Sequence, residues 1–343
     1  GKGTYFSTVL AIYKPNDVTI DVSDKHSNCI GNDSDKKPRN MLNNVTDAFK
    51  TYVCTKSYNS IVLTIGDNYK LPIVNCHLPF DDQTDQNAFV SSINTIITEI
   101  RSNQGILNNE KTNAIVFGDV NLRSFALQKN VDNNFFDTNK KNVVQLNEEC
   151  KTNCKNEIKK LLGDVTKTEV SGITLSKIQD VLNDNSNNTK KQEMMDLIWK
   201  YDMLNTKSIN VDIKNTELSQ TTTISQLLPG DTTARPLDLQ LTYKLNTDPK
   251  LNTDPKLNTY SLNQNRLPGF ADRILNVTTV PTKPNNNDTT VKDNIPTGEP
   301  TITCEEYKSI EWLCPTSDHL GIYSTLKFQF VPLSPKKVPN AEQ

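Results

Sequence analysis

Residues 113–123 read Asn113-Ala-Ile-Val-Phe-Gly-Asp-Val-Asn-Leu-Arg123. Four consecutive apolar residues before a glycine are typical of a buried strand that ends in a turn. Asp119 and Asn121 stand at the end of this strand, where a carboxylate can accept a proton from water and an amide can orient that water or a phosphate. On an extended backbone both side chains lie on the same side. The stretch therefore predicts a strand that ends in a proton-accepting site.

Three further segments combine an apolar run with polar side chains in the same way, and they contain two of the three histidines of the chain. Together the four segments place histidines, aspartates and an asparagine at the ends of strands. These are the groups needed for metal-assisted attack of water on a phosphate. The three segments are Asn75-Cys-His-Leu78, Arg266-Leu-Pro-Gly-Phe-Ala-Asp-Arg-Ile-Leu275 and Pro315-Thr-Ser-Asp-His-Leu320.

In this order the segments resemble the endonuclease/exonuclease/phosphatase superfamily and, within it, the catalytic domain of the inositol polyphosphate 5-phosphatases. The similarity also includes Thr242-Tyr-Lys244 and runs from about residue 5 to about residue 330. It implies an α/β (α+β) fold in which two β-sheets form a sandwich flanked by helices, the DNase I-like four-layer architecture. It further implies one catalytic domain over residues 1–330, followed by a polar tail over residues 331–343.

The resemblance also implies a hydrolase mechanism that depends on Mg²⁺. His77 matches the family histidine that touches the scissile phosphate, and Asp272 matches the carboxylate that holds one ring nitrogen of His319. Such a partner fixes the tautomer of an imidazole and raises its basicity. Asp318 is expected to approach the metal ion. The catalytic residues implied are His77, Asp119, Asn121, Asp272 and His319.

Four residues resemble the positions by which 5-phosphatases hold the neighbouring ring phosphate. Guanidinium groups suit this task, because they bind phosphate through two parallel hydrogen bonds. The expected substrate is therefore a phosphoinositide or a soluble inositol polyphosphate, with the 5-phosphate as the group removed. The substrate-binding residues implied are Tyr243, Lys244, Arg266 and Arg273.

The chain departs from the family pattern at two places. It begins within what reads as an interior strand over residues 2–14, whereas the family has two earlier strands that carry an asparagine and a metal-binding glutamate. We expect these strands, and that glutamate, to be missing from this chain. In addition, Phe270 and Ala271 stand where the family usually has Trp and Cys, and Gln264-Asn265 replaces a basic doublet.

Periodicity predicts the remaining elements. The segment Tyr201-Asp-Met-Leu204 only faintly resembles a family segment, and its periodicity favours the end of an ordinary amphipathic helix. Three loop insertions are expected at about 126–170, at 244–260, where Lys244-Leu-Asn-Thr-Asp-Pro249 is repeated, and at 280–301. Further strands are expected at 60–65, 71–77, 237–241 and 320–331, and helices at 85–103, 175–183 and 191–204.

Composition limits the partners of the chain. A net charge of −2 gives no overall attraction to a polyanion, so nucleic acid is not expected as a partner. No apolar run reaches the roughly 18 residues that a spanning helix needs. The seven cysteines include no CxxC pair, which favours a reducing compartment. We expect a cytoplasmic protein that binds an inositol phosphate or a phosphoinositide headgroup, and peripheral contact with a membrane is compatible with this.

Two other functions remain open on the sequence alone. A metal-dependent nuclease of the same fold would use the same catalytic groups, although the net charge and the Thr242-Tyr-Lys244 segment argue against it. A catalytically inactive phosphoinositide-binding homologue is suggested by the missing glutamate and the expanded repeat. The preferred interpretation is a magnesium-dependent inositol polyphosphate 5-phosphatase.

Overall fold

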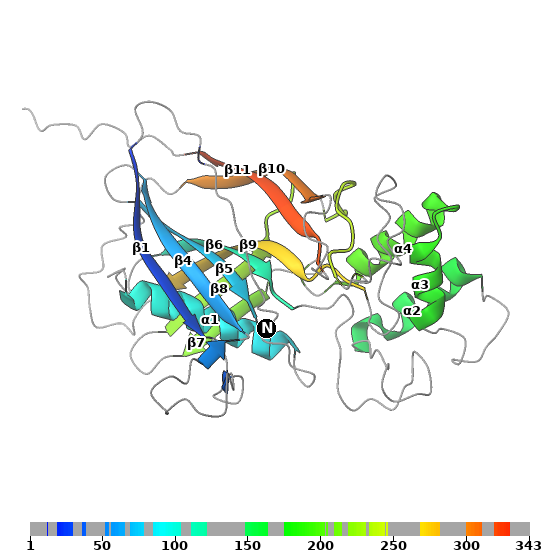
Figure 1. Cartoon of the computed structure of the whole chain (residues 1–343), viewed down its shortest axis with the longest axis horizontal. Coiled ribbons are helices and arrows are strands. Elements are labelled where there is room, and N and C mark those ends of the chain that lie inside the picture. Colours follow the sequence, from blue (N-terminus) through cyan, green and yellow to red (C-terminus); the bar gives the residue numbers. More distant parts are fainter. Residues whose placement is uncertain are drawn as a thin grey trace, which may run out of the picture.

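The chain forms a mixed α/β structure (Figure 1). The structure is a computed structural model, and it describes residues 12, 19–29, 36–38, 52–54, 56–65, 69–78, 85–103, 111–121, 148–163, 175–202, 204, 209–214, 219–230, 233–243, 245, 268–281, 300–310 and 319–329. The strands are β1 (Ile20–Cys29), β2 (Lys36–Pro38), β3 (Tyr52–Cys54), β4 (Ser57–Ile65), β5 (Tyr69–His77), β6 (Thr112–Asp119), β7 (Ile209–Lys214), β8 (Ser219–Gln226), β9 (Asp272–Pro281), β10 (Thr301–Ile310) and β11 (Gly321–Gln329). The helices are α1 (Asp85–Asn103), α2 (Glu148–Leu162), α3 (Leu175–Asn183) and α4 (Asn188–Lys200).

Within the described residues, seven strands form the main sheet in the order β1-β4-β5-β6-β9-β8-β7. Neighbouring strands are antiparallel except for β5 and β6, which run parallel. A parallel pair needs a crossover connection, and α1 lies between β5 and β6 in the chain. The predicted strands 60–65, 71–77 and 113–119 and the predicted helix 85–103 are confirmed.

Helix α1 covers one face of the main sheet. Its apolar residues recur every three or four positions, so they form a stripe along one side of the helix. Phe89, Ile93 and Ile96 from this stripe are fully buried. They belong to one apolar cluster with sheet residues such as Val74 and Val116. This side of the sheet is therefore closed by a helix, as the periodicity predicts.

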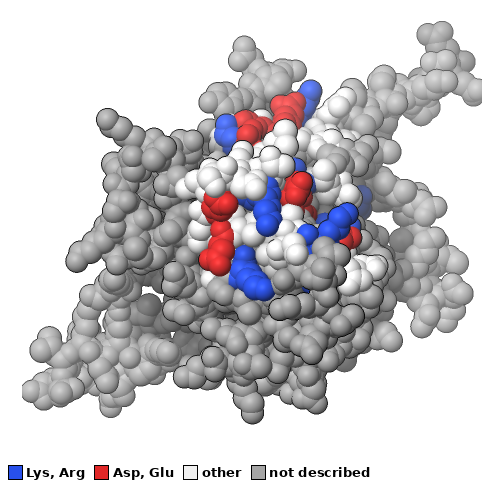
Figure 2. Space-filling model, turned by 90° about the vertical axis from the view of Figure 1, so that its right-hand side faces the viewer, with Lys and Arg blue, Asp and Glu red and all other residues white. Residues whose placement is uncertain are grey.

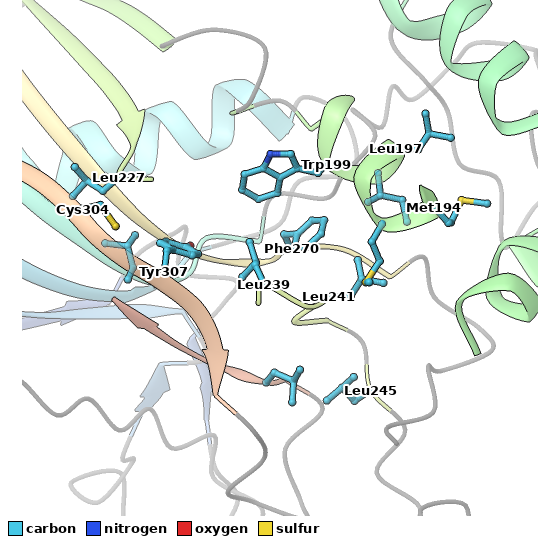
Figure 3. Packing of buried hydrophobic residues seen from close by; sticks show 14 of the residues in the cluster. Met194, Leu197, Trp199, Leu227, Leu239, Leu241, Leu245, Phe270, Cys304 and Tyr307 are labelled. Atoms are coloured by element: carbon cyan, nitrogen blue, oxygen red, sulfur yellow. The ribbon is translucent and has the colours of Figure 1, made fainter. Parts of the chain in front are cut away.

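The hairpin of β10 and β11 packs into the apolar cluster on the other face of the main sheet. The two strands pair antiparallel with each other and form a separate two-stranded sheet. Cys304 and Tyr307 from β10 are buried in one cluster with Ile73 and Ile115 of the main sheet. Figure 3 shows Tyr307 and Cys304 close to Leu227 in this cluster. The predicted strand 320–331 corresponds to β11.

Helices α2 to α4 extend the same cluster beyond the sheets. The Trp199 ring meets the Phe270 ring edge to face, with centroids 5.1 Å apart (Figure 3). Ile158 from α2 is fully buried in the same cluster. The prediction that residues 126–170 form a surface loop is therefore wrong for α2, because this short amphipathic helix has an apolar face that contributes to the core.

The predicted strand 237–241 is also wrong. Leu237 is 84% exposed, whereas Leu239 and Leu241 are buried. The Leu239 N–H donates to the carbonyl of Pro236 at 2.9 Å, which closes a turn instead of a strand. Several predictions lie outside the described residues: the strand 2–14 apart from Ile12, most of the loops 244–260 and 280–301, and the tail 331–343.

Gly118 lies on β6 against the backbone of Cys76 on β5, and we predict that this position accepts no side chain. Its φ is +124°, and an added Cβ would lie 2.2 Å from the carbonyl oxygen of Cys76. Gly118→Ala should lower the free energy of unfolding by about 3 kcal/mol or more, because backbone strain and overpacking add. Gly230→Ala is the control, since it has φ +68° and nothing within 4 Å of the added Cβ. It should cost about 1 kcal/mol. If urea unfolding showed the same loss of unfolding free energy for Gly118→Ala and Gly230→Ala, the prediction would be contradicted.

Candidate active site

Three polar side chains form a row across the main sheet. His77 at the end of β5 lies beside Asp119 at the end of β6, and Asp119 lies beside Asp272 at the start of β9. Side chains alternate along a strand, so these residues share the face of Ile115 and Ile274, which is the face of the β10–β11 hairpin. The register therefore brings together residues that are far apart in the sequence.

Backbone hydrogen bonds bring His319 to this row. The Leu320 N–H donates to the carbonyl of Thr242 at 3.0 Å, and the Asp272 N–H donates to Thr242 Oγ1 at 3.1 Å. Thr242 thus ties the chain before β11 to the start of β9. His319 Nδ1 lies 2.9 Å from Asp272 Oδ2. The expected contact between Asp272 and His319 is present.

Asp119 lies between two imidazoles. Its Oδ2 is 3.2 Å from His77 Nε2 and 3.8 Å from His319 Nε2, and its Oδ1 accepts the N–H of Asn121 at 2.9 Å. Burial raises the pKa of Asp119, but the hydrogen bond from His77 and the charges of His319 and His77 outweigh it, so the pKa is lowered. Asp119 therefore remains ionised.

Asp272 differs from Asp119 in the direction of its pKa shift. Burial raises the pKa of Asp272, and the nearby negative charge of Asp119 adds to this, although the contact with His319 opposes it. Two adjacent carboxylates thus have pKa values shifted in opposite directions. Opposite pKa shifts of two neighbouring carboxyl groups are common where one carboxylate acts as a base and the other orients a histidine.

Asn121 reaches the site with a conformation that differs from the expected one. Its φ is +53°, so the backbone is left-handed here instead of extended. Asparagine tolerates this conformation better than most residues. The side-chain Nδ2 donates to the carbonyl of Leu78 at 2.6 Å, while the backbone N–H holds Asp119. In this structure Asn121 fixes the turn after β6 and the orientation of the Asp119 carboxylate.

The prediction that Arg273 holds a ring phosphate is corrected by the structure. Arg273 follows Asp272 on strand β9, so its side chain points to the opposite face. It is 0% exposed, and its guanidinium forms an ion pair with Asp202, which is also 0% exposed. Nη1 donates to Gln226 Oε1 at 2.7 Å, and Nε donates to the carbonyl of Phe270 at 2.5 Å. The Arg273 donors are engaged inside the protein.

Asp202 is the residue of this group that the sequence does not reveal. Helix α4 ends at Lys200, and Asp202 lies beyond it. Its Oδ1 accepts the N–H of Leu204 at 3.0 Å, while Oδ2 faces Arg273. The interpretation of residues 201–204 as an ordinary amphipathic helix is therefore wrong for Asp202. Its faint similarity to a family segment is the signal that could have identified it.

Tyr243 and Lys56 lie next to the row. The Tyr243 ring contacts the His319 ring, with centroids 4.9 Å apart. The Lys56 ammonium contacts His77 Nε2. Lys56 precedes β4 and belongs to no motif, so it could not be identified from the sequence. The other expected site residues, Lys244, Arg266 and Asp318, lie outside the described residues.

The described residues do not fit a magnesium ion by themselves. Magnesium prefers six oxygen ligands in an octahedral arrangement. Here the Asp119 oxygens face an N–H group and two imidazoles, and the described part of the chain contains no cluster of three or more His, Cys, Asp or Glu side chains that could hold a metal. The site instead consists of His319 between the carboxylates of Asp272 and Asp119, with His77 on the other side of Asp119.

No protein-family model and no curated protein matches this chain. The function is therefore inferred from the site itself. Among the helices in the ranges given above, none is long and apolar enough to cross a membrane.

We predict that the buried pair of Arg273 and Asp202 stabilises the fold much more than the exposed pair of Lys200 and Glu157. Arg273→Met leaves the carboxylate of Asp202 buried without its partner, which should cost about 3–5 kcal/mol. Lys200→Met should cost about 1 kcal/mol or less, because water solvates both side chains of this exposed pair. Urea unfolding of both variants tests this. If both variants lost the same small amount of unfolding free energy, the buried pair of Arg273 and Asp202 would not stabilise the fold more than the exposed pair.

Proposed function

We propose that this chain is a phosphate monoester hydrolase of the inositol polyphosphate 5-phosphatase type. Its substrates would be phosphoinositides or soluble inositol polyphosphates. The main support is the contact between His319 Nδ1 and Asp272 Oδ2 at 2.9 Å, next to Asp119. A histidine oriented by one carboxylate and facing a second, ionised carboxylate suits the activation of water.

The proposal includes a DNase I-like fold of four layers. In its favour, α1 covers one face of the seven-stranded sheet, and the β10–β11 hairpin shares the cluster on the other face with α2 to α4. Active residues at one end of packed sheets are expected in such an arrangement, because sheet packing brings the ends of distant strands together.

Each residue of the row has a role in the proposed reaction. Asp119 accepts a proton from the attacking water, since its lowered pKa keeps it ionised. His319 is held by Asp272 through Nδ1 and directs its Nε2 toward the Asp119 carboxylate. His77 directs its Nε2 toward Asp119 from the other side. A phosphoryl group above the row would meet hydrogen-bond donors from both imidazoles while water meets the carboxylate.

Substrate choice in this proposal depends on groups around the row. The Tyr243 ring contacts the His319 ring and is proposed to pack against the inositol ring. Lys244 and Arg266 are proposed to hold the neighbouring ring phosphate, and Arg273 is no longer assigned to it. Mg²⁺ is carried over from the family resemblance as a requirement to be measured.

A nuclease is the weaker alternative. Double-stranded DNA is bound mainly through its phosphates, which requires a basic stripe on the protein. Figure 2 shows the side of the molecule at the right of Figure 1, where the described Lys and Arg side chains lie among Asp and Glu. The described part of this side offers no basic stripe for DNA.

The decisive substitution is Asp119→Asn, which keeps the shape of the side chain and removes the base. We expect the turnover of an inositol bisphosphate to fall by about a hundredfold or more, with little change in folding. Phosphate release is measured with magnesium and with a chelator. Asp184→Asn, in the exposed turn before α4, is the matched control and should keep full turnover.

Duplex DNA is tested in parallel. Unchanged turnover in Asp119→Asn would remove Asp119 from the mechanism. Cleavage of DNA without release of phosphate from inositol substrates would favour the nuclease.

A further inference from the structure

Lys56 is a cation beside the row of polar residues that neither a motif nor the family resemblance assigns. It immediately precedes β4, and its neighbour Ser57 is paired with His77 across the sheet. Its side chain is half-buried, and its ammonium contacts His77 Nε2. The register of β4 and β5 therefore places Lys56 beside His77, just as the pairing of β5, β6 and β9 places His77, Asp119 and Asp272 beside one another.

The contacts of His77 Nε2 conflict with each other. A neutral imidazole nitrogen carries either a proton or a lone pair. Nε2 can donate to Asp119 Oδ2 at 3.2 Å, or it can accept from the Lys56 ammonium, but not both. If His77 is protonated, both Nε2 and Lys56 are donors that point at each other. An anion that reaches both groups removes this conflict, because each group then donates to one of its oxygens.

We propose that Lys56 and His77 together bind the phosphoryl group of the substrate. The ligand class rests on the proposed function, since the group of His77, Asp119 and His319 is assigned there to phosphate ester hydrolysis. Lys56 supplies a full positive charge at a site where the described residues form no metal-binding cluster. Its ammonium neutralises part of the phosphoryl charge and offsets the repulsion between the phosphate and the Asp119 carboxylate.

A simpler role for Lys56 would be that of a counter-ion for Asp119. The two roles differ in what happens when the carboxylate loses its charge. A counter-ion has no effect in an Asp119→Asn background, whereas a phosphate-binding lysine keeps its effect there. This difference allows a test that does not depend on turnover.

The test is the affinity for inorganic phosphate, measured by calorimetry on the whole chain in the presence of a chelator. Lys56→Met should weaken phosphate binding by about tenfold or more, as expected for the loss of one charge-assisted hydrogen bond. The same factor should separate Asp119→Asn from the double variant that also carries Lys56→Met. Lys56→Arg should stay within about threefold of the unchanged chain, because it keeps the charge and a donor.

Lys70→Met is the matched control. Lys70 is exposed and lies on β5 at the end opposite to His77, so its loss should leave phosphate affinity unchanged. Circular dichroism of each variant checks that the fold is kept. Phosphate affinity of Lys56→Met equal to that of the unchanged chain would overturn the proposal, and so would an effect that disappears in the Asp119→Asn background. Absence of phosphate binding in the unchanged chain would overturn it as well.

Turnover of an inositol bisphosphate separates this inference from the proposed function. Phosphate binding that depends on Lys56, without turnover of any phosphate monoester, would refute the hydrolase and support the binding subsite. Turnover that survives Lys56→Met with unchanged phosphate affinity would refute the subsite and leave the hydrolase in place.

Discussion

The register of β5, β6 and β9 is the constraint on which the rest of the site depends. Because His77, Asp119 and Asp272 are paired neighbours, a shift of one residue in any of the three strands would turn a polar side chain to the other face. Gly118 allows β6 to approach β5 at this point, since no Cβ fits beside the carbonyl of Cys76. The chemistry of the site is thus a consequence of strand pairing.

A second constraint acts through Arg273, the neighbour of Asp272 on β9. The Arg273 guanidinium lies over the Trp199 ring, 5.0 Å from its centroid, and pairs with Asp202 beyond α4. The first residues of β9 are therefore fixed by two sets of contacts, those of Asp272 with His319 and those of Arg273 with Trp199 and Asp202. This explains how a helical part of the chain contributes to the geometry of the site without touching it.

Much of the site could be predicted from the sequence, because its residues stand in short segments at the ends of apolar strands. Helix α1 was equally clear, since its apolar residues follow the helical period. Strand β8 was missed because its sequence, Ser-Gln-Thr-Thr-Thr-Ile-Ser-Gln, is mostly polar and has no clear apolar alternation. Edge and near-edge strands of this kind owe their structure to pairing more than to their own sequence.

The errors at single residues have physical reasons as well. Arg273 was assigned to substrate by family resemblance, although strand alternation places it on the face opposite to Asp272. Asp202 and Lys56 were missed because an aspartate after a helix and a lysine before a strand are common at solvated positions. Their roles come from long-range contacts, at separations of 71 residues for Asp202 with Arg273 and 21 for Lys56 with His77. No local pattern identifies Lys56, and only the faint family similarity of residues 201–204 points to Asp202.

The central claim is that Asp119, together with His77 and His319, directs water to a phosphorus atom. It is tested most directly by hydrolysis of an inositol bisphosphate in water labelled with heavy oxygen, followed by mass spectrometry of both products. The account predicts that the label enters the released inorganic phosphate and not the inositol. Label in the inositol hydroxyl, or no release of phosphate from the substrate, would contradict it.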